Sequence, residues 1–192
     1  MIVAGHETTA ITLFWSLYLL ANAPGWQNAI AVETSGLDLG PEGAPDALAS
    51  LVQTRAVVSE ALRLYPPAFA MMRLAIGPDR AGDLEIPRGA VLMIAPWVLH
   101  RHRRLWRDPD AFDPSRFLPG QPPPPRFAYL PFGAGPRICV GAQFAMVEAT
   151  LVLAALVQSF RMTLADDHEV MPKPILTTQP DRAPAFLLTP RA

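Results

Sequence analysis

Apolar residues recur at helical spacing in two long stretches of the chain, one at each end. The first stretch covers residues 1 to about 22, where the pattern is set by Ile11, Phe14, Trp15, Tyr18 and Leu19. The second runs from residue 141 to about residue 160. Its spacing predicts a core face made of Phe144, Val147, Glu148, Leu151, Val152 and Leu156. Two long helices are therefore expected to frame the fold.

Shorter helices are predicted between these two. A helix over residues 25–33 follows Pro24, and a loop rich in Gly, Pro and Asp covers residues 35–45. Asp46 can cap the next helix, which should end near Leu64 because two prolines follow at positions 66 and 67. Residues 97–102 should add one further helical turn.

Short extended segments are predicted in the middle and at the end of the chain. In the middle they cover residues 70–76, 84–86 and 91–95, with a turn at 87–89. The tail should form one small antiparallel sheet of three strands, over residues 161–165, 175–178 and 185–189. The proline-rich segment 107–127 should be irregular and lie on the surface. The expected class is therefore mainly α with small antiparallel β segments.

Composition narrows the function classes. Hydrophobic residues make up 51% of the 192 residues and charged residues 17%, which excludes a disordered chain. The net charge of −1 gives no sign of nucleic-acid binding, and we interpret the cluster Arg101, Arg103, Arg104 and Arg107 as a solvated surface. The apolar run 10–21 is too short to span a bilayer and has no basic segment before it, so we expect a cytoplasmic chain without a membrane span.

The most informative stretch is Phe132-Gly-Ala-Gly-Pro-Arg-Ile-Cys-Val-Gly141, which holds the only cysteine of the chain. Cys139 stands just before a predicted helix, where free amides and the helix dipole stabilise a thiolate. The glycines allow a flat, bulky group to approach, and Arg137 could bind an anionic part of that group. A haem iron held by one thiolate fits this pattern best.

Other kinds of site are possible interpretations of this loop. A dinucleotide-binding loop would need glycine where Ile138 stands, and the Gly-Lys pair of a P-loop occurs nowhere in the chain. One cysteine cannot build a zinc site alone, and no histidine stands beside it at ligand spacing. A buried cysteine that acts as a small hydrophobic residue remains the alternative.

Two further patterns carry possible chemistry. At Ala4 and Gly5 the backbone of the first helix is hardly covered by side chains, so a flat ligand could lie against it. Glu7 and Thr8 place an acid beside an alcohol, which suits proton transfer to a bound oxygen species. The alternative is a surface glutamate and a threonine that bonds back to its own helix.

Glu60 and Arg63 stand three residues apart, so they are neighbours on one face of the third predicted helix. As an exposed pair they would contribute little stability, typically under about 1 kcal/mol. A third charge, Arg116, could close them into a network with an architectural role.

Four patterns stand in order along the chain: Ala4-Gly5-x-Glu7-Thr8-Thr9, Glu60-x-x-Arg63, Pro114-Ser115-Arg116-Phe117, and the Cys139 loop. In this order they resemble the carboxy-terminal part of a cytochrome P450, and the resemblance covers essentially the whole chain. It implies that residues 1–192 are the carboxy-terminal portion of a single domain, with two long helices that sandwich a haem site and an irregular proline-rich meander. The uncapped apolar start at residues 1–3 suggests that the chain begins inside a helix.

The resemblance also implies roles for single residues. Cys139 would be the thiolate ligand of haem b, Arg137 and Arg73 would pair with its propionates, and His100 is a further candidate for that task. Glu7 and Thr8 would deliver protons, and Glu60, Arg63 and Arg116 would lock a helix to the meander. Close packing on the haem is implied for Phe132, Gly133, Gly135, Gly141, Ala4 and Gly5. Ser115, where relatives often have Glu, and Arg103, where they often have Pro, depart from the pattern without touching this chemistry.

The function that the resemblance implies is insertion of one oxygen atom of O2 into a small apolar substrate. Electrons would come from NAD(P)H through a ferredoxin or flavodoxin type of partner. Two alternatives stay open: a peroxide-driven peroxygenase on the same scaffold, and a non-catalytic fragment that does not hold haem by itself. A small haem sensor is a third possibility.

Overall fold

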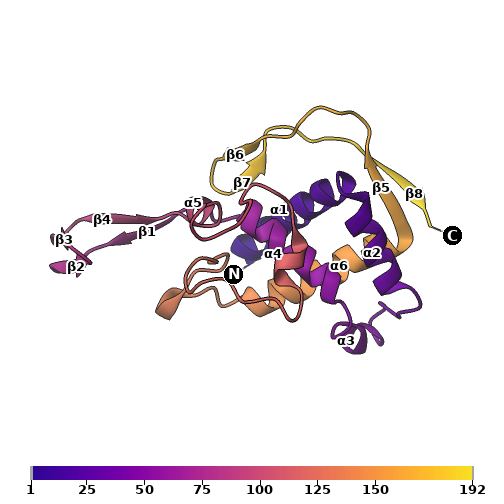
Figure 1. The fold of residues 1–192 in the computed structure, drawn as a ribbon, viewed down its shortest axis with the longest axis horizontal. Coiled ribbons are helices and arrows are strands. Elements are labelled where there is room, and N and C mark those ends of the chain that lie inside the picture. Colours follow the sequence, from indigo (N-terminus) through magenta and orange to yellow (C-terminus); the bar gives the residue numbers. More distant parts are fainter. Residues whose placement is uncertain (1, 192) are drawn as a thin grey trace.

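A computed structural model of the chain describes the backbone of residues 2–191 and the side chains of residues 5–191. Its helices are α1 (Ile2–Ala21), α2 (Pro24–Thr34), α3 (Ala44–Ala47), α4 (Val52–Leu64), α5 (Pro96–Leu99) and α6 (Ala142–Ser159), with 3-10 turns η1 (Pro114–Phe117) and η2 (Gly135–Arg137). The two long helices, the helix over residues 25–33 and the turn near residue 97 are thus confirmed (Figure 1).

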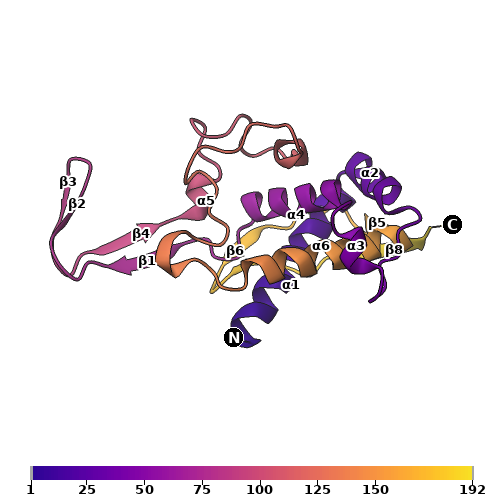
Figure 2. The same cartoon turned by 90° about the horizontal axis from the view of Figure 1, so that it is seen from below.

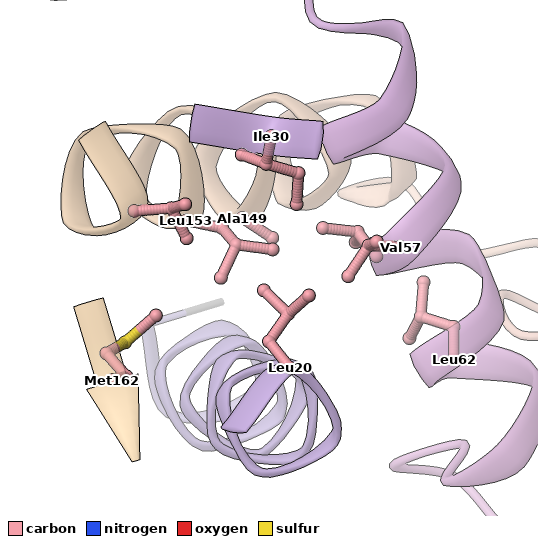
Figure 3. Close-up of a cluster of buried hydrophobic side chains, with 9 residues drawn as sticks. Leu20, Ile30, Val57, Leu62, Ala149, Leu153 and Met162 are labelled. Atoms are coloured by element: carbon pink, nitrogen blue, oxygen red, sulfur yellow. The ribbon is translucent and has the colours of Figure 1, made fainter. Parts of the chain in front are cut away.

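The core lies where α1, α2, α4 and α6 meet. Figure 3 shows side chains from all four helices converging there, together with Met162 from the strand that follows α6. The fully buried members of this cluster include Leu20, Ile30, Val57 and Leu153. A smaller cluster forms around Trp15, whose side chain has no exposed surface.

The predicted core face of α6 is wrong. Phe144 is 71% exposed and Val152 38% exposed, whereas Ala149, Leu153 and Val157 are buried. α6 carries apolar residues on every side, so their spacing alone does not identify which side faces the core. α6 is also the one described helix that is long and apolar enough to cross a membrane by composition, a test that core helices also pass.

The start of α4 also differs from the prediction. Asp46 lies inside α3, and α4 begins at Val52 with Leu51 at its N-cap, which makes no side-chain hydrogen bond. The cap comes instead from Glu33 on α2, whose carboxylate accepts from the amides of Gln53 and Thr54 at 2.5 and 2.9 Å. This carboxylate meets the positive end of α4, where an anion is stabilising.

The central strands form an arm that extends away from the helices (Figures 1 and 2). Strand β1 (Met71–Leu74) pairs antiparallel with β4 (Val91–Ile94), and β2 (Asp79–Ala81) with β3 (Leu84–Ile86). The sequence did not predict β2, which is short, polar and fully exposed.

The tail contains two separate ladders, so the predicted single sheet of three strands is wrong. Strand β5 (Phe160–Leu164) pairs with β8 (Phe186–Pro190), and β6 (Pro172–Pro174) forms a hairpin with β7 (Thr178–Pro180). Residues 107–127 are irregular apart from η1, as predicted.

Candidate functional site

The loop that carries Cys139 contains η2, leads into α6 and is closed by backbone hydrogen bonds. The Cys139 amide donates to the Phe132 carbonyl at 2.9 Å, and the Ile138 amide donates to the Gly135 carbonyl at 3.0 Å. Gly133 and Gly135 both have φ of +73°, a region that favours glycine. These bonds fix the segment that presents the cysteine.

Gly133 also brings the loop against the arm. A Cβ at this position would lie 3.3 Å from the Met71 sulfur on β1, which is tighter than an ordinary contact. Gly141 differs, because its φ is −88° and a Cβ there would lie 3.9 Å from the Cys139 sulfur. The backbone angle therefore requires glycine at position 133, where Met71 also leaves little room for a Cβ, whereas neither angle nor space requires it at position 141.

Cys139 is exposed, which rules out the alternative of a cysteine sealed in an apolar interior. Its neighbours Ile138, Val140 and Phe144 are 57%, 86% and 71% exposed. Gly141 at the N-cap of α6 makes no side-chain cap. The Ala142 amide donates to the Cys139 carbonyl at 3.4 Å, so within the described residues the Gln143 and Phe144 amides are the ones left for a thiolate sulfur. An uncovered apolar surface thus surrounds a thiol at the positive end of a helix.

These features fit a haem better than a bare metal ion. Residues 5–191 contain no group of three or more His, Cys, Asp or Glu side chains that could hold an ion, so one thiolate would be the protein's whole contribution. A porphyrin supplies the remaining equatorial ligands, and its flat apolar ring suits the exposed side chains beside Cys139.

The two arginines proposed for the propionates lie at this end of the molecule. Arg137 is exposed in η2, two residues before Cys139. Arg73 is exposed on β1, and alternation along a strand places it on the same face as Met71, which lies against Gly133. Within residues 5–191 neither arginine forms an ion pair with a carboxylate.

His100 does not have a ring nitrogen left for a propionate, contrary to the expectation from the sequence. Its side chain is fully buried, its Nε2 accepts from the Leu130 amide at 2.8 Å, and its Nδ1 lies 3.2 Å from the Arg63 carbonyl. Burial lowers the pKa of His100 to about 4, so the ring is neutral and Nδ1–H donates. His100 connects α4 to the segment that leads into the Cys139 loop.

Glu60, Arg63 and Arg116 come together as predicted, but the Glu60–Arg63 pair is fully buried rather than exposed. The Arg63 guanidinium donates twice to Glu60, at 2.7 and 2.8 Å, and to the carbonyls of His100, Pro109 and Ala111 at 2.8, 2.5 and 2.9 Å. Every N–H of Arg63 is therefore used. Arg116 Nε lies 3.5 Å from Glu60 at the edge of the pair.

At the start of α1, Glu7 and Thr8 are half-buried and lie on the same turn as the exposed Gly5. The Thr8 hydroxyl donates to the Gly5 carbonyl at 3.3 Å, the local bond expected of a threonine in a helix. Among the described residues outside its own helix turn, no atom lies within 4 Å of where a Gly5 Cβ would be, so this backbone is open to a neighbour. Ala4 lies in the same helix, and its side chain is outside the described part.

Glu7 has two partners that the sequence did not suggest. Its Oε1 accepts from the Thr177 hydroxyl at 2.6 Å and from the Gln179 amide at 3.0 Å, and these bonds lower the pKa of Glu7. The β6–β7 hairpin that supplies them also exposes Ile175 and Leu176 at its tip, by 61% and 79%. No local pattern links a helix at residue 7 with a hairpin near residue 177.

Figures 1 and 2 both show the first turns of α1 and the start of α6 at the same end of the helical body. The arm leaves the body at this end as well, next to the Cys139 loop (Figure 2). The fold thus gathers the thiol, both candidate propionate arginines and the Glu7–Thr8 pair at one end of the molecule.

Comparisons with known proteins agree with this arrangement. The sequence profile described as "Cytochrome P450" matches residues 1–191. Cytokinin hydroxylase from Arabidopsis thaliana is 39% identical over 190 residues, covering 97% of this chain and 36% of the relative. Cyclooctatin synthase from Streptomyces melanosporofaciens is 39% identical over 175 residues, covering 91% and 38%.

Among solved structures, the heme domain of cytochrome P450DA aligns with a TM-score of 0.89 and 31% identity, over 100% of this chain and 43% of that domain. The chain spans about a third of the length of the curated relatives. Because the family profile matches nearly every residue and the fold superposes along its whole length, the chain belongs to the cytochrome P450 family.

Proposed function

We propose that this chain is the thiolate-bearing portion of a cytochrome P450 monooxygenase. The complete enzyme would insert one oxygen atom of O2 into a small apolar substrate, with electrons from NAD(P)H passed on by a ferredoxin or flavodoxin type of protein. The observation that carries this proposal is the exposed Cys139 thiol at the uncapped start of α6, within a loop that matches the family.

The residues that would hold haem b follow from the site. Cys139 would ligate the iron, with the first amides of α6 stabilising its negative charge. Arg137 and Arg73 would bind the propionates, and Gly5 and Gly133 would allow close approach of backbone. When bound, the haem supplies the oxygen-activating and electron-transfer chemistry.

The other residues predicted to pack on the haem would mainly shape the loop and the helices around it. Phe132 is half-buried and packs against the helical core, so it would support the loop from behind. Gly135 provides the turn that precedes Cys139, and Gly141 starts α6. Ala4 would complete the bare face of α1 beside Gly5.

Protons would reach the reacting oxygen through Glu7 and Thr8. The Glu7 carboxylate is held ionised by neutral donors, so it can accept a proton from solvent. Thr8, one residue on, has a hydroxyl that can both donate and accept. This relay favours the O2-dependent route over peroxide chemistry, which does not need it.

An apolar substrate is supported by the side chains near this pair. Ile175 and Leu176 are exposed, by 61% and 79%, at the tip of the hairpin that contacts Glu7. Apolar surface of this kind favours ligands that lose contact with water on binding. The name of one relative, a hydroxylase, is consistent with oxygen insertion into carbon.

The electron donor would bind through charge. Arg126 is exposed on the segment that leads into the Cys139 loop and suits an acidic partner surface. We place the enzyme in the cytoplasm because a single unpaired cysteine suits a reducing compartment.

The test is haem reconstitution of the complete reading frame that contains this chain, beside the 192-residue chain itself. Cys139→Ser should abolish the red-shifted Soret band that a thiolate gives the ferrous–CO complex, while Arg103→Ala, at an exposed position, should keep it. A wild-type protein without that band would overturn the proposal. Haem loss from the 192-residue chain alone would identify it as the non-catalytic fragment.

A further inference from the structure

The contact between Glu7 and the β6–β7 hairpin joins residues 170 positions apart in the chain. The Thr177 hydroxyl is 2.6 Å from Glu7 Oε1 and the Gln179 amide 3.0 Å from the same atom. Among the described residues, both hydrogen bonds to this carboxylate end on Oε1. Oε2 is therefore the oxygen at which Glu7 can exchange a proton.

The hairpin that provides these donors is itself held in place. Thr178, between the two donors, bonds to the carbonyls of Pro66 and Pro67 through its hydroxyl and amide at 2.6 and 3.1 Å. Its own carbonyl accepts from the Trp15 indole at 2.7 Å, and Trp15 stacks on Tyr65 at 3.8 Å between ring centroids. The donors to Glu7 are thus fixed by α1 and by the turn after α4.

Neutral donors dominate the surroundings of Glu7. The Thr177 hydroxyl contributes most to lowering the pKa of Glu7, and the Gln179 amide comes next. The charged groups nearby are His6, on the same helix, and Lys173, which faces Gln179 across the β6–β7 ladder. Of the two, His6 lowers the pKa of Glu7, in the same direction as the two hydrogen bonds.

We infer that Thr177 and Gln179 are positioning residues for Glu7, which orient its carboxylate and keep it ionised so that Oε2 exchanges protons. The inference rests on the proposed role of Glu7 in proton transfer. It assigns the β6–β7 hairpin a part in setting the pH range of the reaction. Removing the Thr177 hydroxyl should therefore change proton transfer without disturbing the Cys139 loop.

The direct test is a carboxyl titration of the chain labelled with ¹³C at glutamate, followed by NMR, with Glu7→Gln assigning the signal. Thr177→Val removes the hydroxyl and keeps the side-chain shape, so the pKa of Glu7 should shift upward. Thr177→Ser keeps the hydroxyl and should leave this pKa where it is. Gln179→Leu should give a smaller upward shift, and it provides a second variant if Thr177→Val fails to fold.

A second measurement follows the loaded protein. In the haem-reconstituted complete protein, reduced in air without added substrate, the midpoint of the pH profile of hydrogen peroxide release should rise in Thr177→Val. The ferrous–CO spectrum should stay unchanged, because among the described residues no hydrogen bond joins the hairpin to the thiolate loop.

An unchanged titration of Glu7 in both Thr177→Val and Gln179→Leu would overturn the inference, and so would an unchanged pH profile alongside a shifted titration. The titration does not depend on the outcome for Cys139, because it needs no haem. A wild-type protein that lacks the thiolate spectrum would instead refute the proposed function.

Discussion

At the scale of single residues, environment decides what each side chain can do. The resemblance implied haem contacts for both His100 and Cys139. In the structure, His100 is fully buried with both ring nitrogens engaged, whereas Cys139 is exposed. Arg63 was expected in an exposed pair and is buried with every donor used. The same residue types therefore serve different tasks according to burial and partners.

His100 makes stability depend on pH. Its pKa is about 4 in the folded chain, chiefly through burial, against 6.5 when exposed, with Arg63 and Arg101 opposing its charge as well. The unfolded chain therefore binds the proton more tightly, and stability is lost as pH falls from about 6.5 to about 4. This loss is on the order of 3 kcal/mol for that difference in pKa.

Urea unfolding of wild type and His100→Asn across that pH window measures the effect. The neutral Asn should lower stability at neutral pH and flatten its pH dependence, while His102→Asn, at an exposed position, should leave the wild-type slope. Tyr129, whose ring centroid lies 5.3 Å from that of His100, is a further titratable neighbour. Equal slopes for wild type and His100→Asn would contradict the assignment.

Arg63→Ala should strongly destabilise the fold. The change leaves the Glu60 carboxylate buried without its main partner and removes three bonds to backbone carbonyls, those of His100, Pro109 and Ala111. Breaking a buried pair in this way typically costs about 3–5 kcal/mol. Denaturant unfolding should show this loss, while Arg103→Ala, on the surface, should show almost none; a cost for Arg63→Ala under about 1 kcal/mol would mean that the pair is dispensable.

At the scale of elements, side chains from distant segments cap the helices and hold them together. α4 has no cap of its own and receives the Glu33 carboxylate from α2, and α1 is joined through Glu7 and Trp15 to the β6–β7 hairpin. Each of these contacts links segments far apart in the chain. The elements therefore form the site only in their assembled arrangement.

Glu33→Ala tests the contact between α2 and α4. Because the carboxylate accepts from the Gln53 and Thr54 amides and from the Thr54 hydroxyl at 2.6 Å, its removal leaves the first turn of α4 uncapped. We expect a loss of about 1–2 kcal/mol in unfolding free energy, the usual range for a lost cap. Glu42→Ala, at an exposed position, is the control, and an equal effect of both changes would argue against a cap.

At the scale of the whole molecule, apolar surface gathers on the arm and around the Cys139 loop. Leu74, Val91 and Met93 on the arm are each more than 60% exposed, as is Val140 beside the thiol. Both strands of the β1–β4 ladder also have an unpaired edge. Surfaces of this kind favour association with other protein segments or apolar ligands.

We therefore expect the isolated 192-residue chain to self-associate as its concentration rises. Replacing Leu74, Val91 and Met93 together by lysine should shift sedimentation toward the monomer, because charges on an edge strand oppose pairing. The same number of lysines at exposed neutral polar positions, such as Asn28, Gln121 and Ser159, is the control for added charge. A wild-type chain that stays monomeric at all concentrations would refute this expectation.

The sequence alone determined the two long helices, the irregular meander and the cysteine loop, because these depend on periodicity, proline content and glycine spacing over a few neighbouring residues. It also indicated the partnership of Glu60, Arg63 and Arg116, since the family pattern places them in order along the chain. Only the tertiary structure decided which face of α6 is buried, where α4 is capped, and that His100 is sealed inside while Cys139 is exposed. Burial and long-range hydrogen bonds depend on how distant segments pack, and the bond from Thr177 to Glu7 is of this kind.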